Sequence, residues 1–171
     1  ETSVLIVGDI KQSIYRWRGG DWKILHGEAQ QALGAGDTQV EVLRENWRSL
    51  PAVVAFNNRI IERIVAADNR ALNETLAKAS EEGSVDPAEA AALRDTLADA
   101  YRGHAQLPRR KAEHPGYVSV ETFAERPPVV ERICALIDKG FRPCDIMILV
   151  RGGTDGAKVA AELLDFKRRN E

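Results

Sequence analysis

Short, continuously apolar runs alternate along the chain with longer amphipathic segments. Residues 4–7 and 146–150 are runs of mainly branched apolar side chains, which is the pattern of strands buried on both faces of a parallel sheet. Residues 40–43 and 117–123 are two further strand-like segments. Because strands alternate with helical patterns, the sequence predicts an α/β fold with a parallel sheet, flanking helices and right-handed crossovers.

Five amphipathic segments predict helices, each with apolar residues spaced three or four positions apart. Asp21 is expected to cap the first helix, which the glycine-rich residues 34–37 end. Ser49 is expected to cap the second helix, which carries Pro51 in its first turn, and Asp86 opens the third. The apolar positions of the five helices are Trp22, Leu25, Ala29 and Leu33; Val53, Phe56, Ile60 and Ile64; Leu93, Leu97 and Tyr101; Val129, Ile133, Leu136 and Ile137, ended by Gly140; and Val159, Leu163 and Phe166.

Changes in composition indicate how the chain is divided. The glycine-rich break at residues 34–37 predicts a domain boundary after about residue 35. Residues 66–115 are rich in Ala, Glu and Asp and are expected to be largely helical, ending in an exposed connector at residues 107–116. The predicted domains are therefore residues 1–35 and residues 36–171.

Composition and charge limit the classes of protein that fit. The 171 residues are 44% hydrophobic and 29% charged, which is enough for a domain with a core. The net charge of -2 means that any contact with DNA has to be local. Two cysteines, Cys134 and Cys144, are too few for a disulfide scaffold and fit a reducing cytoplasm. No apolar stretch approaches the roughly 20 residues of a membrane span, so we expect no membrane partner. The chain begins with Glu1, close to a strand-like run, and is expected to be a piece of a longer protein.

A polar loop follows the first predicted strand and carries candidate binding residues. Gln12 would lie at the carboxyl end of a parallel strand, where ligands of open α/β sheets bind, and could meet a phosphate there. Tyr15, Trp17 and Arg18 combine two aromatic rings with a guanidinium, which suits stacking of unpaired bases and contact with their backbone. Both aromatic residues could instead belong to a core. Burial of the aromatic residues would also bury the interleaved charges, such as that of Arg16, without charged partners, which costs free energy. Exposure for binding is therefore the better interpretation.

Residues 7–20 resemble motif III of the UvrD/Rep helicases of superfamily 1, from Val7-Gly8-Asp9 through Gln12-Ser13-Ile14-Tyr15 to Trp17-Arg18-Gly19. Lys11 and the continuation at residues 19–22 look most like the RecB and AddA helicase-nuclease branch. The resemblance implies that Gln12 senses the terminal phosphate of ATP, in a nucleotide-binding turn that includes Asp9. It also implies that Tyr15 and Trp17 stack DNA bases and that Arg18 contacts the strand.

Residues 43–49, with Asn46-Trp47-Arg48-Ser49, resemble motif IV of the same family. The resemblance implies that Arg48 stabilises charge on the transferred phosphoryl group, as arginine fingers do. It also implies that Trp47 packs by the adenine, where the family usually has Tyr, so a hydrogen bond from the Tyr hydroxyl would be absent. The alternative is a Ser49 helix cap with Arg48 in a surface ion pair. Residues 117–164 resemble the continuation of the second motor domain by pattern alone. Arg151 closes a predicted strand at the edge where ligands bind, but an ordinary solvated arginine explains it equally well.

Two other features are weaker candidates. Residues 152–158 lie between a strand and a helix, but Ala157 and Val159 stand where a Walker A loop needs Gly and Ser or Thr, so a plain turn is expected. The three histidines, His26, His104 and His114, lie far apart without other ligands at metal-binding spacing. We therefore predict no metal site.

The resemblance implies a partial RecA-like fold of the P-loop NTPase type, with residues 1–35 as the C-terminal piece of the first motor domain and residues 36–171 as the N-terminal part of the second. It also implies that the parent protein is an ATP-dependent 3′–5′ DNA helicase or translocase acting in DNA repair or recombination, and the helicase part of a helicase-nuclease. Its cofactors would be ATP and Mg²⁺, and its partners single-stranded or duplex DNA and a nuclease subunit. This chain has neither Walker A nor Walker B, so it is predicted to be inactive by itself. Unpaired edges of residues 4–7 could lead copies to self-associate. The alternative is a helicase-derived, non-catalytic DNA-binding or scaffold subunit.

Overall fold

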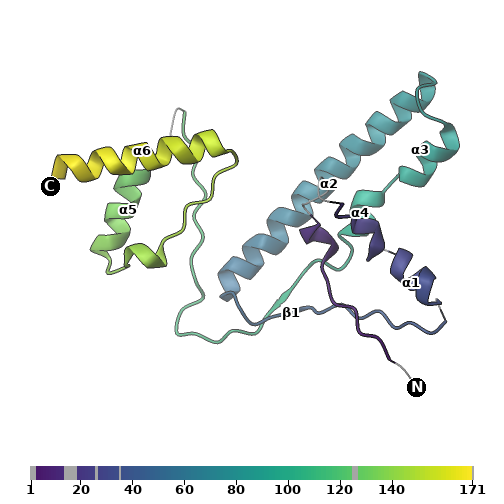
Figure 1. Cartoon of the computed structure of the whole chain (residues 1–171), viewed down its shortest axis with the longest axis horizontal. Coiled ribbons are helices and arrows are strands. Elements are labelled where there is room, and N and C mark those ends of the chain that lie inside the picture. The colour runs from purple at the N-terminus through teal and green to yellow at the C-terminus, as the bar shows by residue number, and fades with distance from the viewer. Residues whose placement is uncertain (1–2, 14–18, 26, 35, 125–126, 171) are drawn as a thin grey trace. The chain divides into compact units, whose positions relative to one another are not determined.

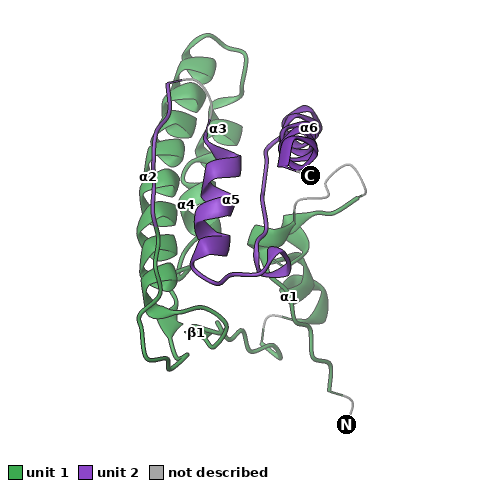
Figure 2. Ribbon diagram, turned by 90° about the vertical axis from the view of Figure 1, so that its left-hand side faces the viewer, with its two compact units in different colours: residues 1–118 green, residues 119–171 purple. Residues whose placement is uncertain are grey.

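The computed structural model describes residues 3–13, 19–25, 27–34, 36–124 and 127–170. The chain forms two compact units, Glu1–Val118 and Ser119–Glu171, which Figure 2 shows in green and purple. We describe each unit by itself. In the part of the chain that the structure describes, no helix is long and apolar enough to cross a membrane.

The first unit combines helices with one small parallel sheet (Figure 1). Strands β1 (Glu45–Asn46) and β2 (Leu107–Pro108) pair in parallel, with Glu45 opposite Leu107 and Asn46 opposite Pro108. Its other elements are the 3-10 turns η1 (Ile10–Gln12) and η3 (Trp22–Ile24) and the helices α1 (Glu28–Leu33), α2 (Pro51–Glu81), α3 (Pro87–Leu93) and α4 (Thr96–Ala100).

Helix α2 is the longest element, with 31 residues and a length of about 46 Å. Pro51 stands at its start, where a missing N–H costs nothing. Val54 is only 2% exposed. The helix extends to Glu81, well into the Ala-, Glu- and Asp-rich part of the sequence that begins at residue 66. Helices α3 and α4 pack along it (Figure 1).

A hydrogen-bonded turn fastens α4 to α2. The side-chain amides of Asn69 and Asn73 both donate to the Asp95 carboxylate at 2.8 Å, and Asn69 also accepts from the backbone N–H of Ala98 at 3.0 Å. These hydrogen bonds, with that from Asn73 contributing most, hold the pKa of Asp95 below its ordinary value. Asp95 has a left-handed φ of 61°, which Asp tolerates better than most residues. The predicted single helix through Leu93, Leu97 and Tyr101 is therefore wrong, because this turn divides it.

One of three predicted N-terminal helix caps is confirmed, and the other two differ from the structure. Asp86 caps α3 as predicted, since its carboxylate accepts from the N–H groups of Ala88 and Glu89. Ser49 does not cap α2, because Leu50 is the N-cap residue and provides no side-chain hydrogen bond. Asp21 caps only the short turn η3, and α1 begins six residues later than the helix predicted there, at Glu28.

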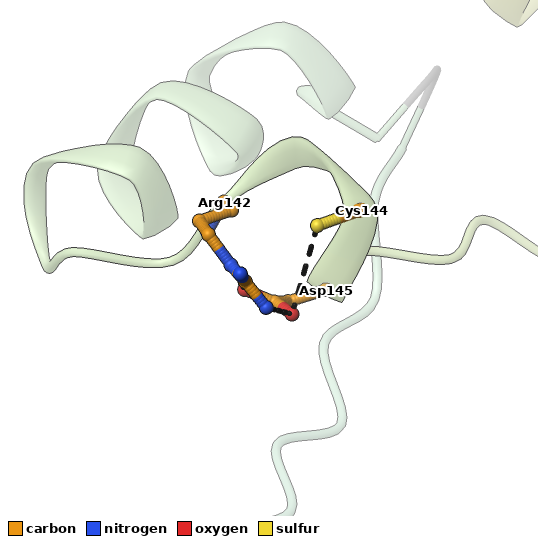
Figure 3. A network of polar contacts seen from close by, with 3 residues as sticks. All are labelled: Arg142, Cys144 and Asp145. Atoms are coloured by element: carbon orange, nitrogen blue, oxygen red, sulfur yellow. Dashed lines mark hydrogen bonds and ion pairs between the residues drawn. The ribbon is translucent and has the colours of Figure 1, made fainter.

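The second unit contains α5 (Val129–Asp138), the 3-10 turn η4 (Pro143–Asp145) and α6 (Gly153–Asn170). Gly140 ends α5 with a φ of 90°, as predicted. Residues 153–158, predicted as a plain turn, instead form the start of α6. The Arg142 side chain binds the Asp145 carboxylate through two hydrogen bonds of 2.9 Å, and the Arg142 backbone N–H donates to the same carboxylate at 3.0 Å. Figure 3 shows this compact turn, which precedes residues 146–150.

The predicted strands are the main correction. Residues 4–7, 40–43, 117–123 and 146–150 join no sheet within the described residues. Leu5 is 88% exposed and Leu149 is 86% exposed. A strand buried on both faces needs hydrogen-bonding neighbours at its edges and cover above and below. Contacts from the described segments do not supply these. The structure agrees with an α/β class through its helices and two-stranded parallel sheet, whereas the RecA-like architecture and the domain boundary near residue 35 stay predictions.

Candidate nucleotide and DNA interface

The first candidate element is the turn that begins at Asp9. The Asp9 carboxylate accepts from the backbone N–H of Lys11 at 3.0 Å and thereby caps η1. The Lys11 ammonium lies 2.6 Å from the same carboxylate. The Gln12 side-chain amide donates to Asp9 at 3.3 Å, which is a long hydrogen bond. The structure therefore brings Asp9, Lys11 and Gln12 together in one exposed turn.

The charge of Asp9 is set by opposing effects. Partial removal of the carboxylate from water raises the pKa of Asp9, but the hydrogen bonds and positive charge of Lys11 lower it more, and Gln12 adds a further hydrogen bond. The net result is a pKa below the ordinary value, so Asp9 is ionised at neutral pH. An ionised Asp9 repels phosphate, so its contribution is to hold Lys11 and Gln12 in place.

Gly8 lies close to the side chain of Leu25 where the chain enters this turn. A Cβ atom at this position would lie 2.4 Å from Cδ1 of Leu25, which follows η3. Any larger residue would push the Leu25 side chain aside. The Gly-Asp pair of the sequence is thus explained by a close approach at Gly8 and a capping carboxylate at Asp9.

The predicted DNA-binding residues Tyr15, Trp17 and Arg18 lie outside the described residues. The stacking and strand-contact roles therefore stay predictions. Neighbouring Gln12 and Lys11 are exposed.

The second candidate element is the turn between β1 and α2. The Asn46 side-chain oxygen accepts from the backbone N–H groups of Arg48 at 3.0 Å and Ser49 at 2.8 Å. This is an Asx-type turn, in which a short polar side chain replaces a backbone acceptor. Trp47 is 69% exposed, and Arg48 is also exposed. Arg48 forms no ion pair with any described residue, so the turn leaves an aromatic ring and a guanidinium open to solvent.

Long-range hydrogen bonds hold the Asn46 turn. The Asn46 side-chain amide donates to the Gln106 side-chain oxygen at 2.7 Å. The Gln106 backbone is in turn bound to the Asn58 side chain by bonds of 2.9 and 3.0 Å. Further along, the Pro115 carbonyl accepts from the first free N–H group of α2, at Ala52, at 2.8 Å. Gln106 and Pro115 therefore help to hold the turn that carries Trp47 and Arg48, and Pro115 lies in the predicted exposed connector at residues 107–116.

Sequence reasoning missed Asn46, Asn58 and Gln106 as positioning residues. Asn46 had a local signal, because an Asn two residues before an exposed polar residue often forms an Asx turn. Asn58 and Gln106 are 48 residues apart in sequence and have no local signal that pairs them. The parallel pairing of β1 with β2, together with the Asn58 side chain, brings Gln106 to the turn.

Comparison with known proteins finds a family match at the N-terminal end of the chain. Residues 1–32 match the family model of the UvrD/REP helicase N-terminal domain. The matched stretch includes the whole η1 turn and residues 14–18.

Two curated proteins are similar over a longer stretch. The chain is 38% identical over 63 residues to an ATP-dependent helicase/nuclease protein of Limosilactobacillus reuteri, which covers 37% of this chain and 4% of that protein. It is 39% identical over 61 residues to the exonuclease/helicase protein RexA of Streptococcus pneumoniae, which covers 35% of this chain and 5% of that protein. The aligned stretch is therefore a small part of these relatives. No solved structure matches the chain.

Proposed function

We propose that the chain is part of the motor of an ATP-dependent DNA helicase that works in DNA repair or recombination, within a helicase-nuclease. The observation that carries this proposal is the match of residues 1–32 to the UvrD/REP helicase family model. The relatives whose names combine helicase and nuclease support the helicase-nuclease context. Movement in the 3′–5′ direction and a separate nuclease partner belong to the same proposal.

In this proposal the Asp9 turn and the Arg48 turn both contact the terminal phosphate of ATP. Gln12 exchanges its long hydrogen bond to Asp9 for one to the terminal phosphate, while Lys11 keeps the Asp9 carboxylate neutralised. Arg48 supplies a positive charge where negative charge develops on the transferred phosphoryl group. Trp47 offers an exposed ring surface for the adenine. Movement of Gln12 on ATP binding would then change the position of residues 15–18, which follow Gln12 in the chain and would hold the DNA bases.

The side chains of the two turns fit phosphate rather than a metal ion. An amide from Gln12 and a guanidinium from Arg48 both donate hydrogen bonds, as phosphate oxygens require. Mg²⁺ prefers carboxylate, carbonyl and water oxygens. When bound, Mg²⁺ would neutralise phosphate charge and would be held by groups other than Gln12 and Arg48, and the proposed role of Arg48 does not depend on ligating it.

The ATP role is tested by Arg48→Ala in the full-length protein that carries this chain. We expect the DNA-stimulated ATPase kcat to fall by a factor of about 100 or more, since arginine fingers and comparable donors contribute on this scale. Arg63→Ala is the matched control, because Arg63 is an exposed arginine on α2. Near-wild-type turnover of Arg48→Ala would contradict the finger role.

The DNA role is tested by Trp17→Ala, measured by fluorescence anisotropy with a labelled single-stranded oligonucleotide. Loss of one stacking ring is expected to weaken binding by about 1 to 3 kcal/mol.

The ATPase activity of the wild-type full-length protein separates the proposal from its alternative. If the protein binds single-stranded DNA tightly but hydrolyses no ATP, it is the non-catalytic DNA-binding or scaffold protein of the alternative.

A further inference from the structure

A basic segment lies directly against the turn that carries Arg48. Residues 109–111 read Arg-Arg-Lys and follow β2 without a break. The Arg109 backbone N–H donates to the Asn46 carbonyl at 2.8 Å, which extends the parallel pairing by one residue. The next side chain, Arg110, donates from its guanidinium to the Arg48 carbonyl at 2.7 Å. Arg110 is thereby fixed beside the Arg48 backbone although 62 residues separate them.

The three basic residues of this segment differ in how their charge is balanced. Arg109 is neutralised by Glu45, with its Nε atom 2.8 Å and its Nη2 atom 2.6 Å from the same carboxylate oxygen. Within the described residues, neither Arg110 nor Lys111 has an ion pair, and Arg48 has none either. Glu113 is the next carboxylate along the segment and is exposed. The hydrogen bond to the Arg48 carbonyl thus holds Arg110 against the Arg48 turn, and Lys111 follows Arg110 directly in the chain. All three residues are exposed, and none has an ion pair with a described residue.

Like charges that a fold holds together repel one another, and an anion bound between them relieves that repulsion. Arg110 uses one guanidinium N–H group on the Arg48 carbonyl, which leaves its remaining donors for another acceptor. Phosphate oxygens are the acceptors that a guanidinium and an ammonium bind best together. Trp47, which directly precedes Arg48 in the chain, is exposed and adds an aromatic surface on which a base can stack.

We propose that Arg110 and Lys111 form a second phosphate-binding group beside Arg48, so that the connector after β2 takes part in ligand binding. The inference rests on the proposed function, because it assumes that the Arg48 turn binds a phosphate-bearing ligand. The phosphate chemistry is shared by the triphosphate of a nucleotide and by the backbone of single-stranded DNA. The two sources give different experimental results.

The test uses the full-length protein and measures two dissociation constants, one for a fluorescent ATP analogue and one for a labelled single-stranded oligonucleotide at several salt concentrations. The variants are Arg110→Ala, Lys111→Ala and the control Arg63→Ala. Lys111→Ala is informative because Lys111 is exposed and makes no hydrogen bond or ion pair with the described residues. Its loss therefore changes charge without disturbing the Arg48 turn.

If the ligand is the nucleotide, Arg110→Ala weakens ATP binding about tenfold and Lys111→Ala about threefold, while DNA binding changes less than twofold. If the ligand is the DNA backbone, the dissociation constant for DNA rises instead, and each variant lowers the salt dependence by about 0.7 in the slope of log K against log salt. Either pattern supports the inference.

Three results would overturn parts of the reasoning separately. Changes below twofold for both ligands in both variants would overturn the inference. A large effect of Arg110→Ala with none of Lys111→Ala would also overturn it, because Arg110 would then act only as a support for the Arg48 backbone. If wild-type protein with a normal melting temperature binds neither ATP nor DNA, the proposed function itself fails, and that failure is visible before any variant is compared.

Discussion

Removal of the Asn46 side chain should open the turn that carries Arg48. Asn46→Ala deletes the acceptor of the N–H groups of Arg48 and Ser49 and the donor to Gln106, which is three hydrogen bonds in all. Each bond contributes about 0.5 to 1.5 kcal/mol net, and the exposed setting favours the lower part of that range. We therefore expect the turn to lose about 2 kcal/mol, which raises its opening equilibrium about thirtyfold.

Hydrogen exchange measured by mass spectrometry on a peptide spanning residues 46–50 reports this opening directly. The amides of Arg48 and Ser49 should exchange about thirtyfold faster in Asn46→Ala. Asn57→Ala is the matched control, because Asn57 is an exposed asparagine on α2 whose side chain makes no hydrogen bond to the described residues. Asn46→Asp should keep both amides protected, since a carboxylate accepts the same bonds and the Gln106 amide can turn to donate to it. Equal exchange in Asn46→Ala and Asn57→Ala would refute the reasoning.

Two further predictions concern the loss of stability when Gly116 or Gly140 is replaced by alanine and the effect of pH on the turn that Asp145 stabilises. Gly116 and Gly140 both have a φ of 90°, so alanine at either position should cost about 1 to 2 kcal/mol of conformational strain. Gly116→Ala should cost more, because its Cβ would lie 2.8 Å from Cβ of Leu50, whereas nothing lies within 4 Å at Gly140; equal losses of amide protection in α2 and α5 would contradict this. The Arg142 side chain, followed by its backbone N–H, lowers the pKa of Asp145, so the stabilisation is complete above the ordinary aspartate pKa and is lost as the pH falls through the lower, folded-state value. As the pH is lowered below the ordinary aspartate pKa, the protection factors of the amides around η4, which are exchange rates relative to the intrinsic rate at each pH, should therefore fall more in the wild type than in Asp145→Asn. Equal falls would show that this ion pair does not stabilise the turn.

Helices were predictable because their signals are local. The spacing of apolar residues located α2, α5 and α6, and Gly140 ended α5 through its own backbone preference. The errors arose where a tertiary contact competed with the local pattern. Asn69 and Asn73 divide a predicted helix by binding Asp95 across a turn. No pattern within residues 86–101 contains that information.

Strands were not predictable to the same extent, because apolar runs specify burial without supplying the neighbours that provide it. Residues 4–7 and 146–150 have strong strand composition, yet the only paired strands among the described residues are the two-residue segments β1 and β2. The pairing of β1 with β2 depends instead on Asn46, Gln106 and the ion pair between Glu45 and Arg109. These are polar residues that hydrophobic periodicity does not detect.

The two candidate turns are held in different ways, and this difference bears on how a nucleotide signal could be passed on. The hydrogen bonds of the Arg48 turn reach across 60 residues to Gln106 and 62 residues to Arg110, so they make it part of a wider frame. The hydrogen bonds described for the Asp9 turn span three residues or fewer. Gln12 can leave Asp9 at a cost of one long, exposed hydrogen bond, about 0.5 to 1 kcal/mol. In the proposed mechanism, a phosphate that draws Gln12 away from Asp9 would therefore move Gln12 at little cost, while the backbone of the Arg48 turn would keep its long-range hydrogen bonds.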